Sequence, residues 1–370
     1  MKRLDYLLRL LAAVLILMLC VGPMAGCSPK GDVVMELDGQ SVTANMYAFW
    51  LSRYKAFFVY YYMNGAEDMQ MWDTVVDETG KTINDTFTGY VKDNARTYAA
   101  ALYLYNHYGL KLSDADKAQI QADMDDLLAA HDSKSALNAE LANYGVNYDI
   151  LKEIYTIEAK VKQLQDYLFS EKGPEPLTKE QRDAYYEKNY ARIEHIFIST
   201  GAKYVYEDEM GTYEIDENGN PVTVPLTEEE LNAQRTKAVE VVAKLSSGES
   251  FSALMEAYNE DTAASLYPDG YYFTRTTNYV EEVISATFEL EENAWRMVES
   301  DIGYHIIRRL PLGEEAYAST ASADFFADFE SNLIVERFTE VMTPYMEKVV
   351  VHDEIADLYS LKSVKPNYQY

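Results

Sequence analysis

The stretch SDIGYHIIRRL, from Ser300 to Leu310, places the imidazole of His305 among residues that favour β-strands. A second stretch, ARIEHIFIST from Ala191 to Thr200, has the same form, with His195 between apolar neighbours. Short runs of β-branched and aromatic residues predict a strand at each place. A titratable ring in a buried strand needs a hydrogen-bond partner, which is either the backbone or another side chain.

The residues between these two strands predict helices separated by polar segments. Thr227 and Glu230 form a capping box that opens a helix to about Leu245. Before this helix, residues 203–224 are polar and rich in turn signals, which is most typical of a solvated hairpin. Two shorter helical patterns follow, Phe251 to Tyr258 and Glu281 to Phe288. The predicted order is a strand, three helices and a strand, with irregular or strand structure before the third helix.

The flanking regions have mainly helical patterns. Residues 33–43 predict a hairpin with its turn at Asp38-Gly39, and Thr43 is placed to cap the helix that follows. An aromatic run, Phe57 to Met63, is more often core than surface at helical spacing, and a client-binding surface is the alternative. The stretch Lys172 to Pro176 is a boundary, because two prolines and a glycine cannot continue a helix. Further helical patterns run from Thr86 to Tyr108, Ser113 to His131, Ser135 to Tyr144, Tyr148 to Ser170, Thr178 to Tyr190 and Ala323 to Val349.

The first 26 residues have the form of a secretory signal. A basic start precedes an apolar segment from Leu10 to Val21, which is short for a membrane span of about 20 residues. Small residues then precede Cys27, an arrangement that resembles a bacterial lipobox and predicts lipidation of that cysteine. The alternative is an ordinary signal peptide with an incidental cysteine. Cys20 lies inside the leader, so the mature chain has one thiol and no internal disulfide.

The composition indicates a folded and strongly acidic protein. Apolar residues make up 48% of the 370 residues, enough for a large core, and the formal net charge is −29. This charge argues against nucleic acid as a partner. Near an anionic membrane it favours a chain that stands off the surface, with the lipid as its tether. Solubility is the simplest interpretation of the acidity.

Several short motifs, taken together, resemble the parvulins, a family of small peptidyl-prolyl cis/trans isomerases. The resemblance covers Arg192 to Pro311, and its most specific motif is the one that contains His305. In chain order the motifs are His195-Ile196, Phe251-Ser252-Ala253-Leu254, Tyr258-Asn259-Glu260-Asp261, Thr287-Phe288-Glu289-Leu290 and Gly303-Tyr304-His305-Ile306-Ile307. The resemblance implies a four-stranded antiparallel sheet surrounded by helices.

The family pattern also implies site residues. The paired family histidines correspond to His195 and His305, which would hydrogen-bond each other across neighbouring strands. Asp261 would be the acidic catalytic residue beside them, although an aspartate after a helix is by default a turn residue. The walls of the proline pocket would come from three positions, Tyr279, Val283 and Phe288. The resemblance implies no cofactor and no metal.

The chain departs from the family pattern at several positions. The usual glycine-rich turn reads Tyr267-Pro268-Asp269-Gly270-Tyr271, a small polar residue is replaced by Ile302, and Val283 makes a shallower pocket wall than phenylalanine. These changes predict a reshaped pocket with weaker turnover. A zinc site at the two histidines would need a third ligand, for which Asp261 is the only obvious residue. The long acidic loop after the first strand argues against selection of phosphorylated substrates.

The wider layout resembles exported foldases of the PrsA and SurA type. The expected fold is α+β, with a signal peptide (1–26), a helical chaperone-like segment (27–176), a parvulin domain (177–313, core 192–311) and a C-terminal helical segment (314–370) returning to the first. The expected function is that of an extracytoplasmic, lipid-anchored prolyl isomerase that assists the folding of exported polypeptides containing Xaa-Pro bonds. The alternative is a non-catalytic holdase chaperone with a degenerate parvulin domain. The long helices at both ends leave a homodimer open.

Overall fold

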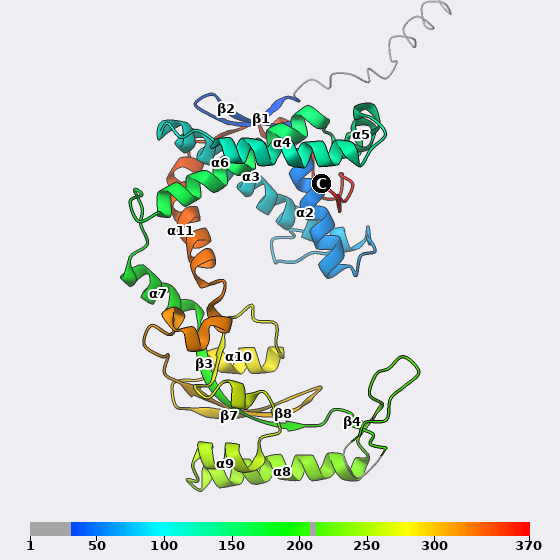
Figure 1. The fold of residues 1–370 in the computed structure, drawn as a ribbon, viewed down its shortest axis with the longest axis vertical. Coiled ribbons are helices and arrows are strands. Elements are labelled where there is room, and N and C mark those ends of the chain that lie inside the picture. Colours follow the sequence, from blue (N-terminus) through cyan, green and yellow to red (C-terminus); the bar gives the residue numbers. More distant parts are fainter. Residues whose placement is uncertain (1–30, 208–211) are drawn as a thin grey trace, which may run out of the picture. The chain divides into compact units, whose positions relative to one another are not determined.

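The computed structural model describes residues 31–207 and 212–370. The predicted leader, Cys27 and the hairpin signal at Met210-Gly211 lie outside the described residues. The chain divides into two compact units (Figure 1), of which unit 2 is Leu177–Leu333 and unit 1 is the preceding part together with Ile334–Tyr370. Residues 314–333, which the sequence analysis assigned to the C-terminal segment, therefore belong to unit 2.

Unit 1 is mainly helical and has one small antiparallel sheet, with strand order β2-β1-β9. Its strands are β1 (Val33–Leu37), β2 (Gln40–Thr43) and β9 (Val350–Val351). Its helices are α2 (Ala44–Tyr62), α3 (Ile83–His107), α4 (Asp114–Ala129), α5 (Lys134–Leu141), α6 (Tyr148–Phe169), α12 (Asp353–Ala356) and most of α11 (Phe329–Met346). None of the helices in the described ranges is long and apolar enough to cross a bilayer.

The C-terminal residues complete the core of unit 1. Phe338 and Met342 of α11 are buried in the same apolar cluster as residues of α2, α3 and α6. The ammonium group of Lys55, only 2% exposed, donates a hydrogen bond to the carbonyl of Val364 at 2.8 Å. These contacts confirm the prediction that a C-terminal helix packs back on the N-terminal helices.

The aromatic run at the end of α2 is divided between core and surface. Phe58 is buried, but four other aromatic side chains of the run are between 50% and 64% exposed, namely Phe57, Tyr60, Tyr61 and Tyr62. The preferred interpretation of the run as core is therefore wrong for its larger part. Successive residues of a helix point in different directions, and the core of unit 1 covers one side of this last stretch.

Unit 2 is built on a four-stranded sheet with the order β6-β3-β8-β7. All neighbouring strands are antiparallel, which confirms the predicted sheet, although no residue pattern had separately indicated β7. The four strands are β3 (Ala191–Ser199), β6 (Tyr271–Phe273), β7 (Trp295–Ser300) and β8 (Gly303–Leu310). The other elements are α7 (Lys179–Asn189), β4 (Lys203–Tyr204), β5 (Thr223–Val224), α8 (Glu228–Ser246), α9 (Phe251–Tyr258) and α10 (Glu281–Glu289).

The two faces of this sheet pack against different helices (Figure 1). Alternate residues of β3 and β8, such as Ile196 and Ile306, point towards α8 and α9 and form a buried cluster with Leu254. The residues between them point to the opposite face, where Ile193 and Ile307 pack with α10. His195 and His305 belong to this second face because they have the same parity along their strands.

Candidate functional site

The two histidines meet across the central pair of strands. In the β3–β8 register His195 pairs with Ile307 and Phe197 pairs with His305, so the two imidazoles are diagonal neighbours on one face. His195 Nε2 lies 3.0 Å from His305 Nδ1, within hydrogen-bonding distance. The rings are nearly parallel, and their exposed fractions are 3% and 0%. Each ring thus gives the other a polar partner in an apolar layer, and the expected contact is present.

The loop after α9 brings a carboxylate to this pair. Asn259 Oδ1 accepts a hydrogen bond from the amide of Phe197, and the Glu260 amide donates to the carbonyl of Phe197, so the loop is held on β3. Asp261 Oδ2 then lies 3.7 Å from His195 Nδ1, and it accepts a hydrogen bond of 2.7 Å from the hydroxyl of Tyr271. The other Asp261 oxygen accepts from the Ala263 amide, so this residue is also a turn residue.

Ser300, which was not predicted as a site residue, lies beside His305 at the end of the histidine pair that is farther from Asp261. Ser300 Oγ is 2.8 Å from His305 Nε2, and it accepts a hydrogen bond from the amide of Ile302. The family pattern had directed attention to Ile302, whose side chain is 45% exposed. The signal needed the prediction of a strand ending before residues 301–302, because the parity of such a strand pair puts Ser300 on the same face as His305.

Electrostatics order the protons along this row. The neighbouring His195 ring and the Tyr271 hydroxyl lower the pKa of Asp261 to about 2, although partial burial acts in the opposite direction. Burial, followed by the proximity of His195, lowers the pKa of His305 to about 4. At neutral pH Asp261 is therefore an anion and His305 a neutral ring.

The anion fixes the tautomers. Its negative charge favours a proton on His195 Nδ1, and in that tautomer of the neutral ring His195 Nε2 is an acceptor. His305 Nδ1 is then the donor between the rings, and His305 Nε2 accepts a hydrogen bond from the hydroxyl of Ser300. The opposite order would direct a lone pair of His195 at the carboxylate, which is repulsive.

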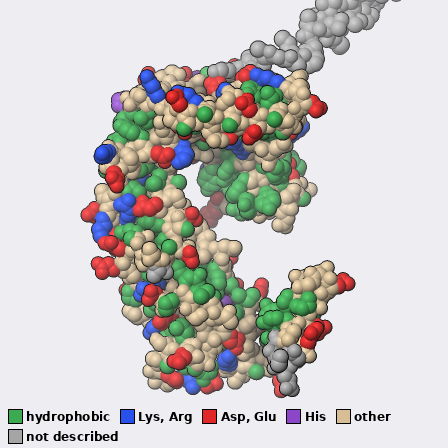
Figure 2. Space-filling model, viewed as in Figure 1, with side chains coloured by type: hydrophobic (Ala, Val, Ile, Leu, Met, Phe, Trp, Pro, Cys, Tyr) green, Lys and Arg blue, Asp and Glu red, His purple; other side chains and the backbone are tan. Residues whose placement is uncertain are grey.

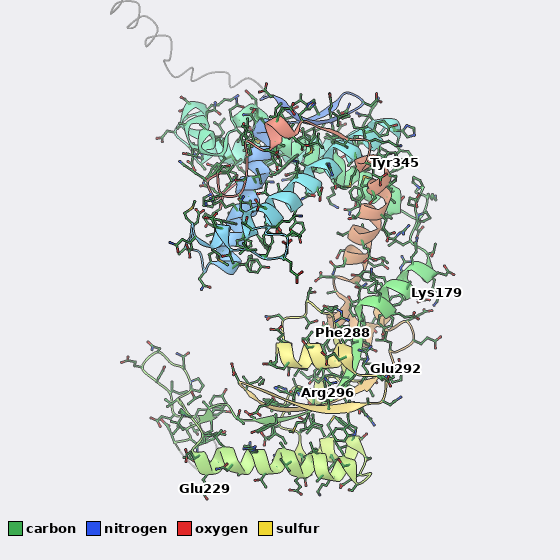
Figure 3. The ribbon with its side chains drawn as sticks, turned by 180° about the vertical axis from the view of Figure 1, so that it is seen from behind. Lys179, Glu229, Phe288, Glu292, Arg296 and Tyr345 are labelled. Atoms are coloured by element: carbon green, nitrogen blue, oxygen red, sulfur yellow. The ribbon has the colours of Figure 1, made fainter. Side chains whose placement is uncertain are left out.

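The three expected pocket residues have different positions. Tyr279 lies edge-on to both imidazoles, with ring centroids 6.4 Å from His195 and 6.3 Å from His305, and it is 39% exposed. Val283 is completely buried in the cluster under α10, so it presents no surface to a ligand in this structure. Phe288 lies at the end of α10 (Figure 3), and its ring faces the guanidinium of Arg275 at 4.3 Å. Tyr279 is thus the one of the three that adjoins the histidines.

The match to a known domain family covers most of unit 2. Residues 179–310 match the model of the PPIC-type PPIASE domain. This part of the chain is a parvulin-type peptidyl-prolyl isomerase domain. No curated protein that was compared with the chain matches it.

Several solved structures are also similar to the chain. PrsA from Bacillus subtilis has 17% identity and a TM-score of 0.24, with 86% of this chain and 92% of that chain covered. PrsA from Bacillus cereus has 19% identity and a TM-score of 0.27, with coverage of 75% and 90%. A structure reported for the SurA-like chaperones PEB4 and Cj1289 of Campylobacter jejuni has 16% identity and a TM-score of 0.19, with coverage of 91% and 100%.

The parvulin domain can present one charge and several aromatic faces to a ligand. Asp261 keeps 19% of its side chain exposed, whereas the imidazoles beneath it are almost inaccessible. Tyr271 and Phe197 are half-buried, and Tyr279 is exposed beside them. Access of a ligand to either imidazole is therefore limited in this structure. Among the described residues, no group of three or more His, Cys, Asp or Glu side chains is arranged to hold a metal ion.

Proposed function

We propose that the chain is an exported, lipid-anchored peptidyl-prolyl cis/trans isomerase that speeds the folding of polypeptides outside the membrane. The observation that carries this proposal is the ordered row formed by Asp261, His195, His305 and Ser300 inside a parvulin domain. The signal-like residues 1–26 and the lipobox-like position of Cys27 support export and anchoring.

The chemistry needs no covalent intermediate. Rotation about an Xaa-Pro bond has a barrier of about 18–20 kcal/mol, because the twisted amide loses its resonance. A planar amide carries more negative charge on its carbonyl oxygen than a twisted one does. The anion of Asp261 near that oxygen therefore destabilises both planar forms relative to the twisted form, and this difference lowers the barrier. Aromatic side chains such as Tyr279 and Phe197 would hold the apolar pyrrolidine ring.

The role of Asp261 is tested by isomerisation of short Xaa-Pro peptides, measured by NMR exchange spectroscopy. Asp261→Ala should lower kcat/KM by about 10²-fold, which is the typical loss when one preorganised electrostatic group is removed. Asp261→Asn, which removes the charge at nearly constant size, should lose most of the same activity. The matched control is Asp301→Asn, which removes an exposed carboxylate in the β7–β8 turn. A wild-type rate equal to the uncatalysed rate, or full activity in Asp261→Ala, would overturn the proposal.

A holdase chaperone is the second candidate, and the exposed aromatic side chains of α2 favour it. The exposed rings of Phe57, Tyr61 and Tyr60 adjoin one another, with centroid distances of 4.6 Å for Phe57–Tyr61 and 5.0 Å for Tyr60–Tyr61. The exposed ring of Tyr62 stacks on Phe58 at 4.8 Å. Such surfaces bind apolar segments of unfolded chains. The burial of Val283, which removes one expected pocket wall, also favours the holdase chaperone.

Aggregation assays with a proline-free client separate the two candidates. A holdase predicts full protection by the Asp261→Ala chain and a clear loss of protection when Tyr60, Tyr61 and Tyr62 are all replaced by serine. An isomerase without holdase activity predicts that neither protein protects this client. Because the client contains no proline, isomerisation cannot contribute to the result.

A further inference from the structure

The segment between β3 and α8 folds into an element of its own, which we call the arm (residues 203–207 and 212–224). Its base is the antiparallel pair β4–β5, of which Figure 1 labels β4. Further bridges join Tyr206 to Tyr213 and Ile215 to Pro221. The carboxylate of Asp216 accepts hydrogen bonds from the amides of Asn218 and Asn220, which closes the second turn. The arm is therefore a formed element with paired backbone groups.

The apolar side chains of the arm are left in contact with solvent. Tyr204, Tyr206 and Tyr213 are 50%, 53% and 41% exposed, and Ile215 is 50% exposed. None of the arm residues in the described ranges belongs to a buried apolar cluster. The tyrosine rings pack on one another instead, with centroid distances of 4.8 Å for Tyr204–Tyr213 and 5.1 Å for Tyr206–Tyr213. Apolar side chains gather on the arm in Figure 2 as well.

The charge of the arm defines the partner that this aromatic surface accepts. Its exposed carboxylates are Glu207, Glu214, Asp216 and Glu217. The one cation of the described arm, Lys203, is paired with Glu230 of α8. A surface of tyrosine faces among carboxylates suits Arg and Lys side chains, because a guanidinium stacks on an aromatic ring while its edge pairs with an acid. Anionic partners such as phosphopeptides are repelled.

We propose that the arm binds cationic, extended segments of polypeptide rich in Arg and Lys. The arm continues directly from β3, the strand that carries His195, through Thr200, whose amide donates to the carbonyl of Ile302. A basic segment held on the arm is thus concentrated at the parvulin domain. This inference rests on the proposed function only for its biological use, since binding by the arm requires no isomerisation.

Fluorescence anisotropy of the purified chain with a labelled, proline-free Arg/Gly peptide tests the proposal. Replacing Tyr204, Tyr206 and Tyr213 by serine leaves the net charge unchanged and should weaken binding by about tenfold or more. Replacing the same residues by phenylalanine should retain binding, because stacking needs the ring and not the hydroxyl. The matched control replaces three exposed tyrosines of unit 1, Tyr90, Tyr167 and Tyr368, by serine.

The acidic contribution is tested with Glu207→Gln, Glu214→Gln and Glu217→Gln combined. This variant should bind the peptide more weakly and show a flatter dependence on salt, because fewer ion pairs remain to be screened. A peptide with Glu in place of Arg should not bind. Equal binding of the Glu peptide, or wild-type affinity in the tyrosine-to-serine variant, would overturn the proposal.

The two proposals fail separately in this design. The Asp261→Ala chain should bind the Arg/Gly peptide with wild-type affinity, whatever its isomerase rate. Wild-type isomerase activity on short neutral peptides combined with no binding of the Arg/Gly peptide would reject the arm and leave the enzyme. Binding of the Arg/Gly peptide without any isomerase activity would reject the proposed isomerase and leave the arm as a binding surface.

Discussion

At the scale of single residues, the order of the two imidazoles depends on groups at both ends of the pair. Ser300→Ala removes the hydroxyl that lies 2.8 Å from His305 Nε2 and leaves a buried nitrogen without this partner. Such a loss costs about 1–3 kcal/mol of unfolding free energy, and it should also slow isomerisation because the tautomers are no longer fixed. Ser300→Thr keeps the hydroxyl and should retain most of the unfolding free energy and most of the isomerisation rate.

Urea denaturation and NMR exchange on Xaa-Pro peptides check this prediction. The matched control is Ser285→Ala, which removes an exposed hydroxyl from α10. If Ser300→Ala and Ser285→Ala behave alike in both measurements, Ser300 does not position the pair.

The titration of His305 gives a second prediction at this scale. Its pKa falls from 6.5 to about 4 on folding, so between these values the unfolded chain binds a proton that the folded chain excludes. The free energy of unfolding should therefore fall as the pH is lowered through this window, by up to about 3 kcal/mol from this group. Asp261, whose pKa is lowered from 3.8 to about 2, adds a further loss only below about pH 4.

Urea denaturation at pH 7 and pH 4.5 measures the effect. His305→Gln removes the titrating ring, and the difference between the two pH values should shrink by about 2 kcal/mol. The matched control is His107→Gln, which removes an exposed histidine of α3. An equal pH dependence in wild type and His305→Gln would contradict the assignment.

At the scale of elements, the β3–β8 pair depends on a glycine at its end. Gly303 has φ of +152°, a backbone conformation that residues with a Cβ rarely adopt. A Cβ there would lie 2.3 Å from the carbonyl oxygen of Ile198 and 2.9 Å from the ring of Phe197. The strand that carries His305 can therefore begin close to β3 only with glycine at this position.

Gly303→Ala should destabilise unit 2 by about 3 kcal/mol or more, since a contact with backbone is added to the strained conformation. Gly248→Ala is the matched control, because Gly248 has φ of +95° with no atom within 4 Å of a Cβ. It should cost only about 1–2 kcal/mol. Hydrogen–deuterium exchange of the β3 and β8 amides measures the destabilisation in both variants. Equal protection in the two variants would show that the contact of a Cβ at residue 303 with β3 does not affect stability.

At the scale of the whole molecule, the net charge bears on the proposed anchoring. Residues 1–26 carry Lys2, Arg3, Asp5 and Arg9, so their removal makes the net charge of −29 more negative by two. An acidic chain of this kind is repelled by anionic lipid headgroups, so the proposed membrane attachment would depend on a covalent lipid.

Lipidation of Cys27 is therefore the prediction at this scale. In a bacterial host, mass spectrometry of the N-terminal peptide should find a thioether-linked lipid on Cys27, and Cys27→Ser should abolish labelling with palmitate. Cys20→Ser, which changes the other cysteine inside the predicted leader, should keep the label. A mature N-terminus without lipid would show that the small residues before Cys27 form an ordinary cleavage site.

Features that depend on near neighbours along the chain could be predicted from the residues alone. The capping boxes of Thr178 with Gln181 and Thr227 with Glu230 are present in the structure, because both partners lie within one helical turn. Thr43, in contrast, stands at the N-cap of α2 but makes no capping hydrogen bond with its side chain. The apolar runs predicted the positions of β3 and β8. The resemblance to the parvulins indicated the two histidines that lie in contact.

Which groups cover each side chain depends on the folded chain. The β7–β8 register places Ser300 beside His305. Val283 of α10 is buried in an apolar cluster with residues of the sheet. The tyrosines at the end of α2 remain exposed to solvent. Periodicity states which residues share a face, but it does not state which distant element, if any, packs on that face. The contact between Ser300 and His305 spans only five residues, but it depends on β7, which no residue pattern had indicated. Burial under helices arises from contacts between residues far apart in the chain, and these form only when the whole fold is present.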